Sequence, residues 1–356
     1  MAIMQTTGLA PLGTQDLQRA GALSRWVSRH ALILVLGALM LIMPAIASDF
    51  ILVQVFGWAM ILGIIALSLM FLAGYGGMVS LAQMTVAGVS GYMITVFGVS
   101  SLPAISLFWP WWLAAPIAIA IAVAFGTLTG VLSSRTEGIY TIMITLAIAA
   151  AFFYLTLQNW PIFNGFAGFT TIPAPIAFGI NWKHPVPLYY LILFFAALSY
   201  LAVVYVSRTP FGLALQGVRD NPRRMEAIGY NVVAHRVAAY ASAALIASIG
   251  GILMVWLNNQ ISPGSNGIEA SIDLLIIAVV GGLGHPIGAF VGAIIYVLLR
   301  TFALDALVAV GLDGRRFQTL IGLGFLIIVL FSPDGVIGLW RRWVARAGGP
   351  GERSGF

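Results

Sequence analysis

The sequence predicts an all-α polytopic membrane protein with about ten transmembrane helices. Hydrophobic residues make up 60% of the 356 residues, and the mean hydropathy is +1.00. Charged residues make up only 8%, whereas about a quarter of an ordinary globular chain is charged. Long apolar runs recur through the sequence, and a run of roughly 17–25 apolar residues can cross the bilayer core as a helix. These three observations leave no room for a sizeable soluble domain.

Ten apolar runs are predicted to form the membrane helices, in chain order. Their approximate bounds are 31–47, 51–73, 78–98, 111–132, 139–158, 187–206, 237–257, 270–283, 286–303 and 317–332.

The eighth and ninth runs are separated by Gly281-Gly282-Leu283-Gly284-His285-Pro286. Proline cannot continue the helical hydrogen-bond ladder, and glycine weakens a helix. We therefore expect a break here rather than one long helix, which would reduce the total to nine spans. The 270–283 piece is short for a full span, so it is expected to be tilted or re-entrant.

The distribution of basic residues predicts that both termini are cytoplasmic. Alternation through ten spans leaves only Lys183, Arg315 and Arg316 outside, with Arg300 near an outer helix end. The expected organisation is a cytoplasmic N-terminal tail (1–30), a transmembrane domain (31–339) and a cytoplasmic C-terminal tail (340–356). The basic residues expected inside are Arg19, Arg25, Arg29, Arg135, those of the 207–236 loop, Arg341, Arg342, Arg346 and Arg353.

The sequence offers no support for catalysis or for a bound cofactor. There is no cysteine, and the four histidines, at positions 30, 184, 235 and 285, lack the spacing of metal ligands. The Gly281-Gly282-x-Gly284 stretch lacks the Gly-Lys-Ser/Thr of a phosphate-binding loop. We therefore expect neither an enzyme nor a cofactor or metal site.

The segment 207–236 is a polar island between two membrane runs, and we call it the 207–236 loop. It holds five of the 17 basic residues and two of the 11 acidic ones. So much charge on so apolar a chain indicates a surface that meets another protein. The charged residues are Arg208, Arg219, Asp220, Arg223, Arg224, Glu226 and Arg236.

A short helix is predicted inside this loop. Asn221 is a favoured N-cap, Pro222 suits the first turn, and Gly229 suits the left-handed position past a helix end. The helix would have about two turns and a length of roughly 10 Å, with Met225 and Ile228 on one face. So short a helix is unstable alone, so it must pack on the membrane rim of its own chain or insert into a partner. A plain interfacial helix is the alternative. The residues proposed for docking are Arg219, Asp220, Asn221, Arg223, Arg224, Met225, Glu226, Ala227, Ile228 and Gly229.

The third run is unusually rich in small and polar residues. The glycines around it, and the Gly126-x-x-x-Gly130, Gly284-x-x-x-Gly288 and Gly288-x-x-x-Gly292 pairs, are interpreted as close helix packing. Gln83 differs, because an amide inside the membrane needs a hydrogen-bond partner or an aqueous cavity. It is the best pore-lining candidate.

Acidic residues are nearly absent from the predicted spans, with only Asp273 close to a helix start. Ion-coupled carriers and proton pumps place acidic residues or histidine within the membrane. A transporter without them must draw energy from elsewhere, and an external ATPase docking on the 207–236 loop would supply it.

Several of these stretches resemble one family: the permease subunits of ATP-binding-cassette importers for branched-chain amino acids, specifically the longer, M-type member of the permease pair. The resemblance runs from about residue 51 to 340. It is carried by Gly74-Tyr75-Gly76-Gly77-Met78-Val79-Ser80-Leu81, Gly138-Ile139-Tyr140 with Thr145-Leu146, Ala214-Leu215 with Arg219-Asp220 and Ala227-Ile228-Gly229, Gly281-Gly282-Leu283-Gly284 with Gly288, and Ser332-Pro333-Asp334-Gly335.

The sequence departs from the family pattern at two places where solute could pass. Phe163-Asn164-Gly165-Phe166-Ala167-Gly168-Phe169 replaces a T-G-G-S/A-x-G-L-like run, and Ala82-Gln83 stands where the family favours Gly-His or similar. The identity of the solute is therefore open. The candidates for the translocation path are Tyr75, Ser80, Gln83, Thr85 and Thr145.

The resemblance implies an importer subunit of the bacterial inner membrane that hydrolyses nothing itself. Its partners would be a second homologous permease, two ATP-binding subunits and an extracytoplasmic solute-binding protein, and the 207–236 loop would seat its short helix in an ATPase groove. The alternatives are a related permease for urea, amides or small carboxylates, and a passive channel or self-sufficient carrier for a small neutral solute.

Overall fold

The computed structural model describes residues 37, 39–102, 105–177, 179–309, 322–323 and 335–338. Most of the predicted run 317–332 lies outside these residues, as do 31–36 and 38 of the run 31–47 and the predicted tails 1–30 and 340–356. The chain divides into two units between Ala47 and Ser48. Residues 39–46 of the first unit are helical. The elements from η1 onward belong to the second unit.

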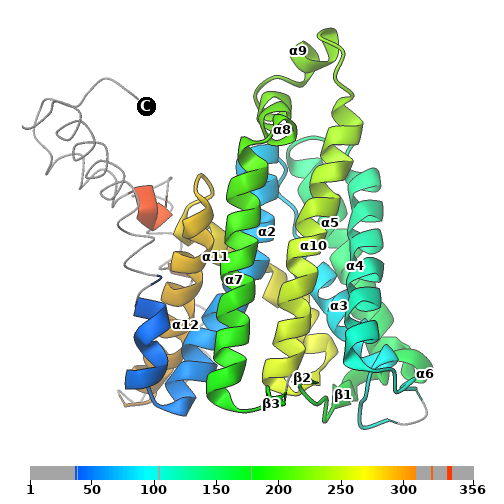
Figure 1. Cartoon of the computed structure of the whole chain (residues 1–356). Helices are drawn as coiled ribbons and strands as arrows, with labels where there is room; N and C mark the ends of the chain where they lie inside the picture. Colours follow the sequence, from blue (N-terminus) through cyan, green and yellow to red (C-terminus); the bar gives the residue numbers. More distant parts are fainter. Residues whose placement is uncertain are drawn as a thin grey trace, which may run out of the picture. The chain divides into compact units, whose positions relative to one another are not determined.

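Within the described residues, five helices are long and apolar enough to cross a membrane, and each coincides with a predicted run. Figure 1 shows them side by side. The first is one continuous helix in three parts: η1 (Ile51–Gly57) and η2 (Phe71–Tyr75) have π-helical bonding, and α2 (Trp58–Met70) lies between them. The others are α4 (Trp111–Ser133), α5 (Ile139–Gln158), α7 (Pro185–Arg208) and α10 (Val232–Asn258).

The predicted break after residue 281 is confirmed. Helix α11 (Ile268–Gly281) is followed by α12 (Pro286–Ala309), and the two are bent by 117° where they meet. With 14 residues, α11 extends roughly 21 Å at 1.5 Å per residue, too short for a full span. The total of ten spans includes runs outside the described residues and stays a prediction.

The third predicted run, 78–98, forms a shorter helix than expected. Helix α3 (Gln83–Phe97) has 15 residues, because residues 78–82 remain irregular after η2 ends. Gln83 therefore stands at the first turn of a helix and not at its middle.

Helices α2 and α10 form the core, whereas α4, α5 and α7 are peripheral. The apolar stretches of α2 and α10 are mostly buried, and those of the three peripheral helices are mostly exposed. Helix α10 packs against α3 and α4, and α2 packs against α12. The peripheral helices expose large apolar side chains such as Phe194 and Leu201, which suits a surface that faces lipid.

The interpretation of the glycine pairs is confirmed for four residues and wrong for one. A Cβ on Gly126 or Gly130 would overlap Ala244 or Tyr240 of α10, so these glycines allow α4 and α10 to approach closely. Gly288 and Gly292 abut α11 in the same way. Gly284 has no atom within 4 Å of its Cβ position, because it lies in the turn between the bent helices.

The 159–186 connection contains only very short elements before α7 begins at Pro185. They are α6 (Trp160–Phe163), η3 (Gly165–Ala167), β1 (Phe169–Thr170), β2 (Ile176–Ala177) and β3 (Ile180–Asn181). Strands β2 and β3 pair with each other, and β1 pairs antiparallel with β4 (Gln260–Ile261), with Phe169 opposite Ile261. This pairing fixes the connection to the segment that follows α10, where η4 (Pro263–Asn266) leads into α11.

Candidate functional site

The 207–236 loop folds into two helices that are delimited by three capping side chains. Thr209 accepts from the Gly212 N–H at 3.4 Å and opens α8 (Pro210–Asp220). Asn221 accepts from the Arg224 N–H at 3.0 Å and opens α9 (Pro222–Ala227). Asn231 accepts from the Ala234 N–H at 2.9 Å and opens α10. The predicted N-cap at Asn221 is therefore confirmed, as is the positive φ of Gly229, +93°.

Helix α8, which the sequence did not predict as a separate helix, anchors the loop to the rest of the chain. Its buried face includes Leu215 and Val218, which are fully buried, and Gly212 lies against the Val206 carbonyl of α7. Burial of two aliphatic side chains of this size contributes about 1.5–3 kcal/mol each. The loop is therefore held at its first half, and its second half projects from it (Figure 1).

Arg219, at the end of α8, points into its own chain. Its guanidinium donates to the Gly74 carbonyl and forms an ion pair of 2.9 Å with Asp220. Its aliphatic stem packs on Gly77, where φ is +67° and a Cβ would lie 2.6 Å from Arg219 Cγ. Glycine is required at position 77 for two reasons: its φ is positive, and a side chain would overlap the stem of Arg219.

The breaks in the membrane helices meet beside Arg219. Gly74 lies against the Leu283 carbonyl in the turn between α11 and α12. Gly282, in that same turn, lies 2.6 Å from the Cβ position of Gly335. Four stretches far apart in the sequence thus converge at one place: the end of η2, the α11–α12 turn, the start of 335–338 and the end of α8.

The irregular residues 78–82 are held by side-chain hydroxyls. Thr145 of α5 accepts from the Leu81 N–H at 3.1 Å and donates to carbonyls of its own helix. Ser80 is buried and accepts from the Ala82 N–H. Gln83 is also buried, and its Oε1 accepts from Ser68 Oγ at 3.1 Å.

The five path candidates do not share one surface. Ser80, Gln83 and Thr145 lie around the irregular stretch and are satisfied by protein groups. Thr85 is fully buried, and its hydroxyl has no hydrogen-bond partner in the described part of the chain. Tyr75 is half-buried and contacts Phe71 one turn earlier, with ring centroids 6.0 Å apart.

Helix α9 is the most exposed part of the loop, with no buried residue. Met225 covers Gly217 of α8, so it faces its own chain, whereas Ile228 is 64% exposed. The two therefore do not form the common apolar face that the spacing predicts, since Ile228 lies past the helix end in the C-cap position. The exposed residues are Asn221, Arg223, Arg224, Glu226, Ala227, Ile228, Gly229 and Tyr230.

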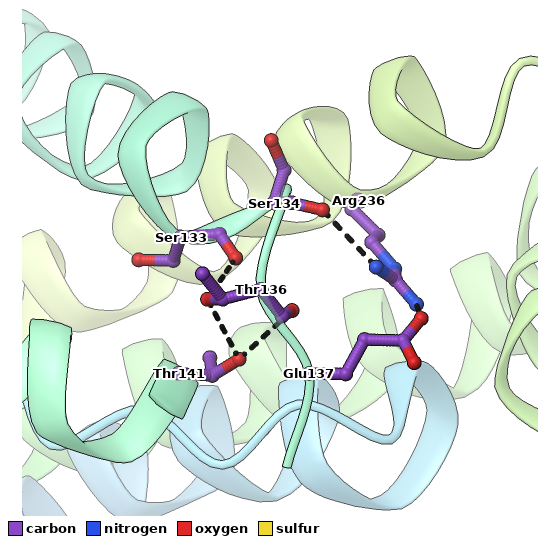
Figure 2. A network of polar contacts seen from close by, with 6 residues as sticks. All are labelled: Ser133, Ser134, Thr136, Glu137, Thr141 and Arg236. Carbon is purple, nitrogen blue, oxygen red and sulfur yellow. Dashed lines mark hydrogen bonds and ion pairs between the residues drawn. The ribbon is translucent and has the colours of Figure 1, made fainter. Parts of the chain in front are cut away.

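A second arginine of the loop contacts its own chain, as Figure 2 shows. Arg236, in the first turns of α10, is 9% exposed. It donates to the Ser134 carbonyl at 3.0 Å and forms an ion pair of 2.8 Å with Glu137, whose side chain is 69% exposed. Thr136 and Thr141 stabilise the same turn, because their hydroxyls hydrogen-bond to each other and donate to the carbonyls of Ser133 and Thr136, respectively. Arg236 therefore joins α10 to the connection between α4 and α5.

The sequence did not separate Arg219 and Arg236, which contact their own chain, from the other arginines of the loop. All belong to the same run of charge, and the contacts of each arginine depend on which way the capped helices turn. Within the described residues, no group of three His, Cys, Asp or Glu side chains lies close enough to hold a metal ion.

The fold is that of a multi-span helical membrane protein with a capped, protruding loop beside converging helix breaks. Comparison with known proteins gives the family. Residues 51–330 match the model of the branched-chain amino acid transport system permease component, and the chain belongs to this family. It is therefore a multi-pass membrane protein of a family of transport subunits, which are not themselves enzymes.

The chain is similar to several curated relatives. It is 23% identical to the high-affinity branched-chain amino acid transport system permease protein LivM of Escherichia coli, over 78% of this chain and 66% of the relative. It is 25% identical to a probable LivM of Methanocaldococcus jannaschii, over 62% and 67%. It is 22% identical to the ribose import permease protein RbsC of Haemophilus influenzae, over 70% and 76%.

The chain thus spans slightly under two thirds of the length of the Escherichia coli relative. No solved structure matches it significantly.

Replacement of Arg236 by methionine is expected to lower the free energy of unfolding by about 1–3 kcal/mol, because the buried Ser134 carbonyl loses a charged donor. Glu137→Gln should cost less, since Glu137 is exposed and an exposed ion pair contributes little. Thermal unfolding of the detergent-solubilised protein measures both. Equal effects of the two substitutions would contradict this assignment.

Proposed function

We propose that this chain is a permease subunit of an ATP-driven importer for branched-chain or related small amino acids. The family supports the transport role, and the similarity to branched-chain amino acid permeases supports this class of solute. The complete importer would contain a second homologous permease, two ATP-binding subunits and an extracytoplasmic solute-binding protein. ATP would be hydrolysed by the ATP-binding subunits, not by this chain.

The observation that carries the proposal is the exposure of α9 on a firmly held α8. An isolated helix of six residues is not stable in water, and here the cap at Asn221 and the contact of Met225 with α8 hold it in place. Arg223, Arg224 and Ile228 are all exposed on this short segment. A segment that exposes two arginines and an apolar side chain suits insertion into a groove with an acidic rim. We assign that groove to an ATP-binding subunit.

Arg219 has a different role in this proposal. Because it contacts the Gly74 carbonyl and Gly77, it is a positioning residue that transmits movement and not a docking residue. A displacement of α9 would move α8, and α8 would carry the end of η2 with it. Since Gly74 also abuts the α11–α12 turn, the movement would reach both breaks in the membrane helices.

We also propose the orientation and domain organisation that the basic residues predict. Both tails, 1–30 and 340–356, and the 207–236 loop would be cytoplasmic, and the transmembrane permease domain would occupy 31–339 with ten spans. Lys183 and the 159–186 connection would face the solute-binding protein. Gln83, Ser80, Thr145 and Tyr75 stay predictions for the translocation path.

Charge reversal at Arg223 and Arg224 is expected to detach the ATP-binding subunit and to reduce uptake at least tenfold, because two charged contacts would be lost. Co-purification and uptake in membrane vesicles measure the two effects. Arg219→Met should retain the ATP-binding subunit but still lose uptake, because only transmission is broken.

Arg208→Glu is the matched control. Arg208 is exposed on the same loop, but it ends α7 and lies outside α9, so its reversal should leave both attachment and uptake intact. Normal uptake by the double reversal at Arg223 and Arg224 would refute the docking role. Solute flux through this chain alone, unaffected by ATP, would point instead to a passive channel.

The absence of cysteine makes the orientation directly measurable. A single cysteine at Lys183 should react with a membrane-impermeant thiol reagent added to intact cells. A cysteine at Glu226, which is exposed, should react only after permeabilisation. The reverse pattern would contradict the proposed orientation.

A further inference from the structure

Asn266 is a buried polar side chain without a partner. It ends η4, directly before α11, and its exposed fraction is 0%. Neither its Oδ1 nor its Nδ2 forms a hydrogen bond to any part of the described chain. A buried amide that could form several hydrogen bonds but forms none is costly. The packing of the described chain does not explain why an unpaired amide lies here.

The amide lies against α3 at Gly88. A Cβ on Gly88 would overlap the Asn266 Cγ, Nδ2 and Oδ1 atoms, so only glycine leaves room for the amide here. Thr85 and Tyr92 lie one turn before and one turn after Gly88, on the same side of the helix at about 100° per residue. Asn266 therefore reaches α3 between a threonine hydroxyl and a tyrosine ring.

The Thr85 hydroxyl is the second unpartnered group on this side of α3. It is fully buried and forms no hydrogen bond within the described residues. Two other buried hydroxyls of the helix have backbone partners, because Ser90 donates to Ala87 O at 2.8 Å and Thr95 donates to Tyr92 O at 2.6 Å. The buried α3 hydroxyls without a hydrogen bond in the described chain are those of Thr85 and Tyr92, one turn before and one turn after Gly88.

An aromatic wall continues this region beyond Gly88. The Tyr92 ring is edge-on to Phe152, Phe163 and Phe169, with centroids 6.2, 5.3 and 6.2 Å away. Phe163 and Phe169 belong to the stretch that departs from the family pattern. The region therefore combines two free polar groups with a large apolar surface, which are the ordinary components of a small-molecule site.

We propose that Asn266 and Thr85 contact the solute on its way through the membrane, and that the solute is a zwitterionic amino acid with an apolar side chain. The Asn266 amide carries both a donor for a carboxylate and an acceptor for an ammonium group. The aromatic wall takes the apolar side chain.

The surroundings favour a molecule without net charge. Arg236 is the one charged residue among the buried residues of the described chain. It lies near the opposite end of α10 from the segment that leads to Asn266, roughly 33 Å from Asn258 along the helix axis. This proposal rests on the proposed function, since it names a solute-contacting part of the same importer.

The test uses the complete importer in proteoliposomes with radiolabelled leucine. Asn266→Leu keeps the size of the side chain but removes the amide, and Thr85→Val removes the free hydroxyl. Both variants should lower leucine uptake about tenfold or more, because loss of the amide or of the hydroxyl leaves polar groups of the solute unpaired. ATP hydrolysis stimulated by the loaded binding protein should persist, and the unfolding temperature should stay equal or rise, since each substitution removes an unpaired buried group.

Thr95→Val is the matched control, because Thr95 is an equally buried threonine of α3 whose hydroxyl has a backbone partner. It should retain uptake. Normal uptake by Asn266→Leu and Thr85→Val would overturn the proposal. So would a fall in uptake that is matched by a fall in unfolding temperature, because that result indicates a structural role. A wild-type complex that binds its partners but takes up no leucine would instead overturn the proposed function, and this assignment with it.

Discussion

The structure depends on one constraint: every backbone polar group within a bilayer must find its partner inside the protein. Continuous helices meet this constraint by themselves, but this chain interrupts its helices at 76–82 and at 282–285. Specific groups satisfy the backbone at the first interruption. The Leu81 N–H donates to Thr145, the Met78 N–H donates to the Leu72 carbonyl, and Arg219 donates to the Gly74 carbonyl. Removal of the buried Thr145 hydroxyl would leave the Leu81 N–H without this partner.

A consequence is that the two interruptions and the 207–236 loop form one connected region. Gly74 lets the end of η2 lie against the Leu283 carbonyl, so the first break is in direct contact with the second. Gly335 approaches the backbone of Gly282 in the same turn. Helix α8 closes the same region from the loop side through Arg219. On the other side of the loop, Arg236 joins α10 to the connection between α4 and α5. The loop is therefore connected to the membrane helices at two places: by the Arg219 hydrogen bond to the Gly74 carbonyl and by the Arg236–Glu137 ion pair.

Much of the fold follows from the sequence, because the period and length of apolar runs depend on local composition. The five long helices and the bend after residue 281 are of this kind, as are the caps at Asn221 and Gly229. What could not be predicted depends on tertiary geometry. The contact of Arg219 with Gly74 and the separation of Met225 from Ile228 depend on how α8 packs, whereas the burial of Arg236 depends on how α10 meets the α4–α5 connection. Asn266 is inconspicuous in sequence, and only the approach of η4 to Gly88 gives it a role.

The central claim is that the exposed tip of the 207–236 loop is seated in an ATP-binding subunit. The most direct measurement places a single cysteine at Ile228 in this cysteine-free chain, attaches a thiol-linked photo-crosslinker in native membranes, and identifies the adducts by mass spectrometry. The account predicts an adduct with an ATP-binding subunit from position 228 and none from a cysteine at Lys183. An Ile228 probe that crosslinks only to lipid, or to the same proteins as the Lys183 probe, would contradict the account.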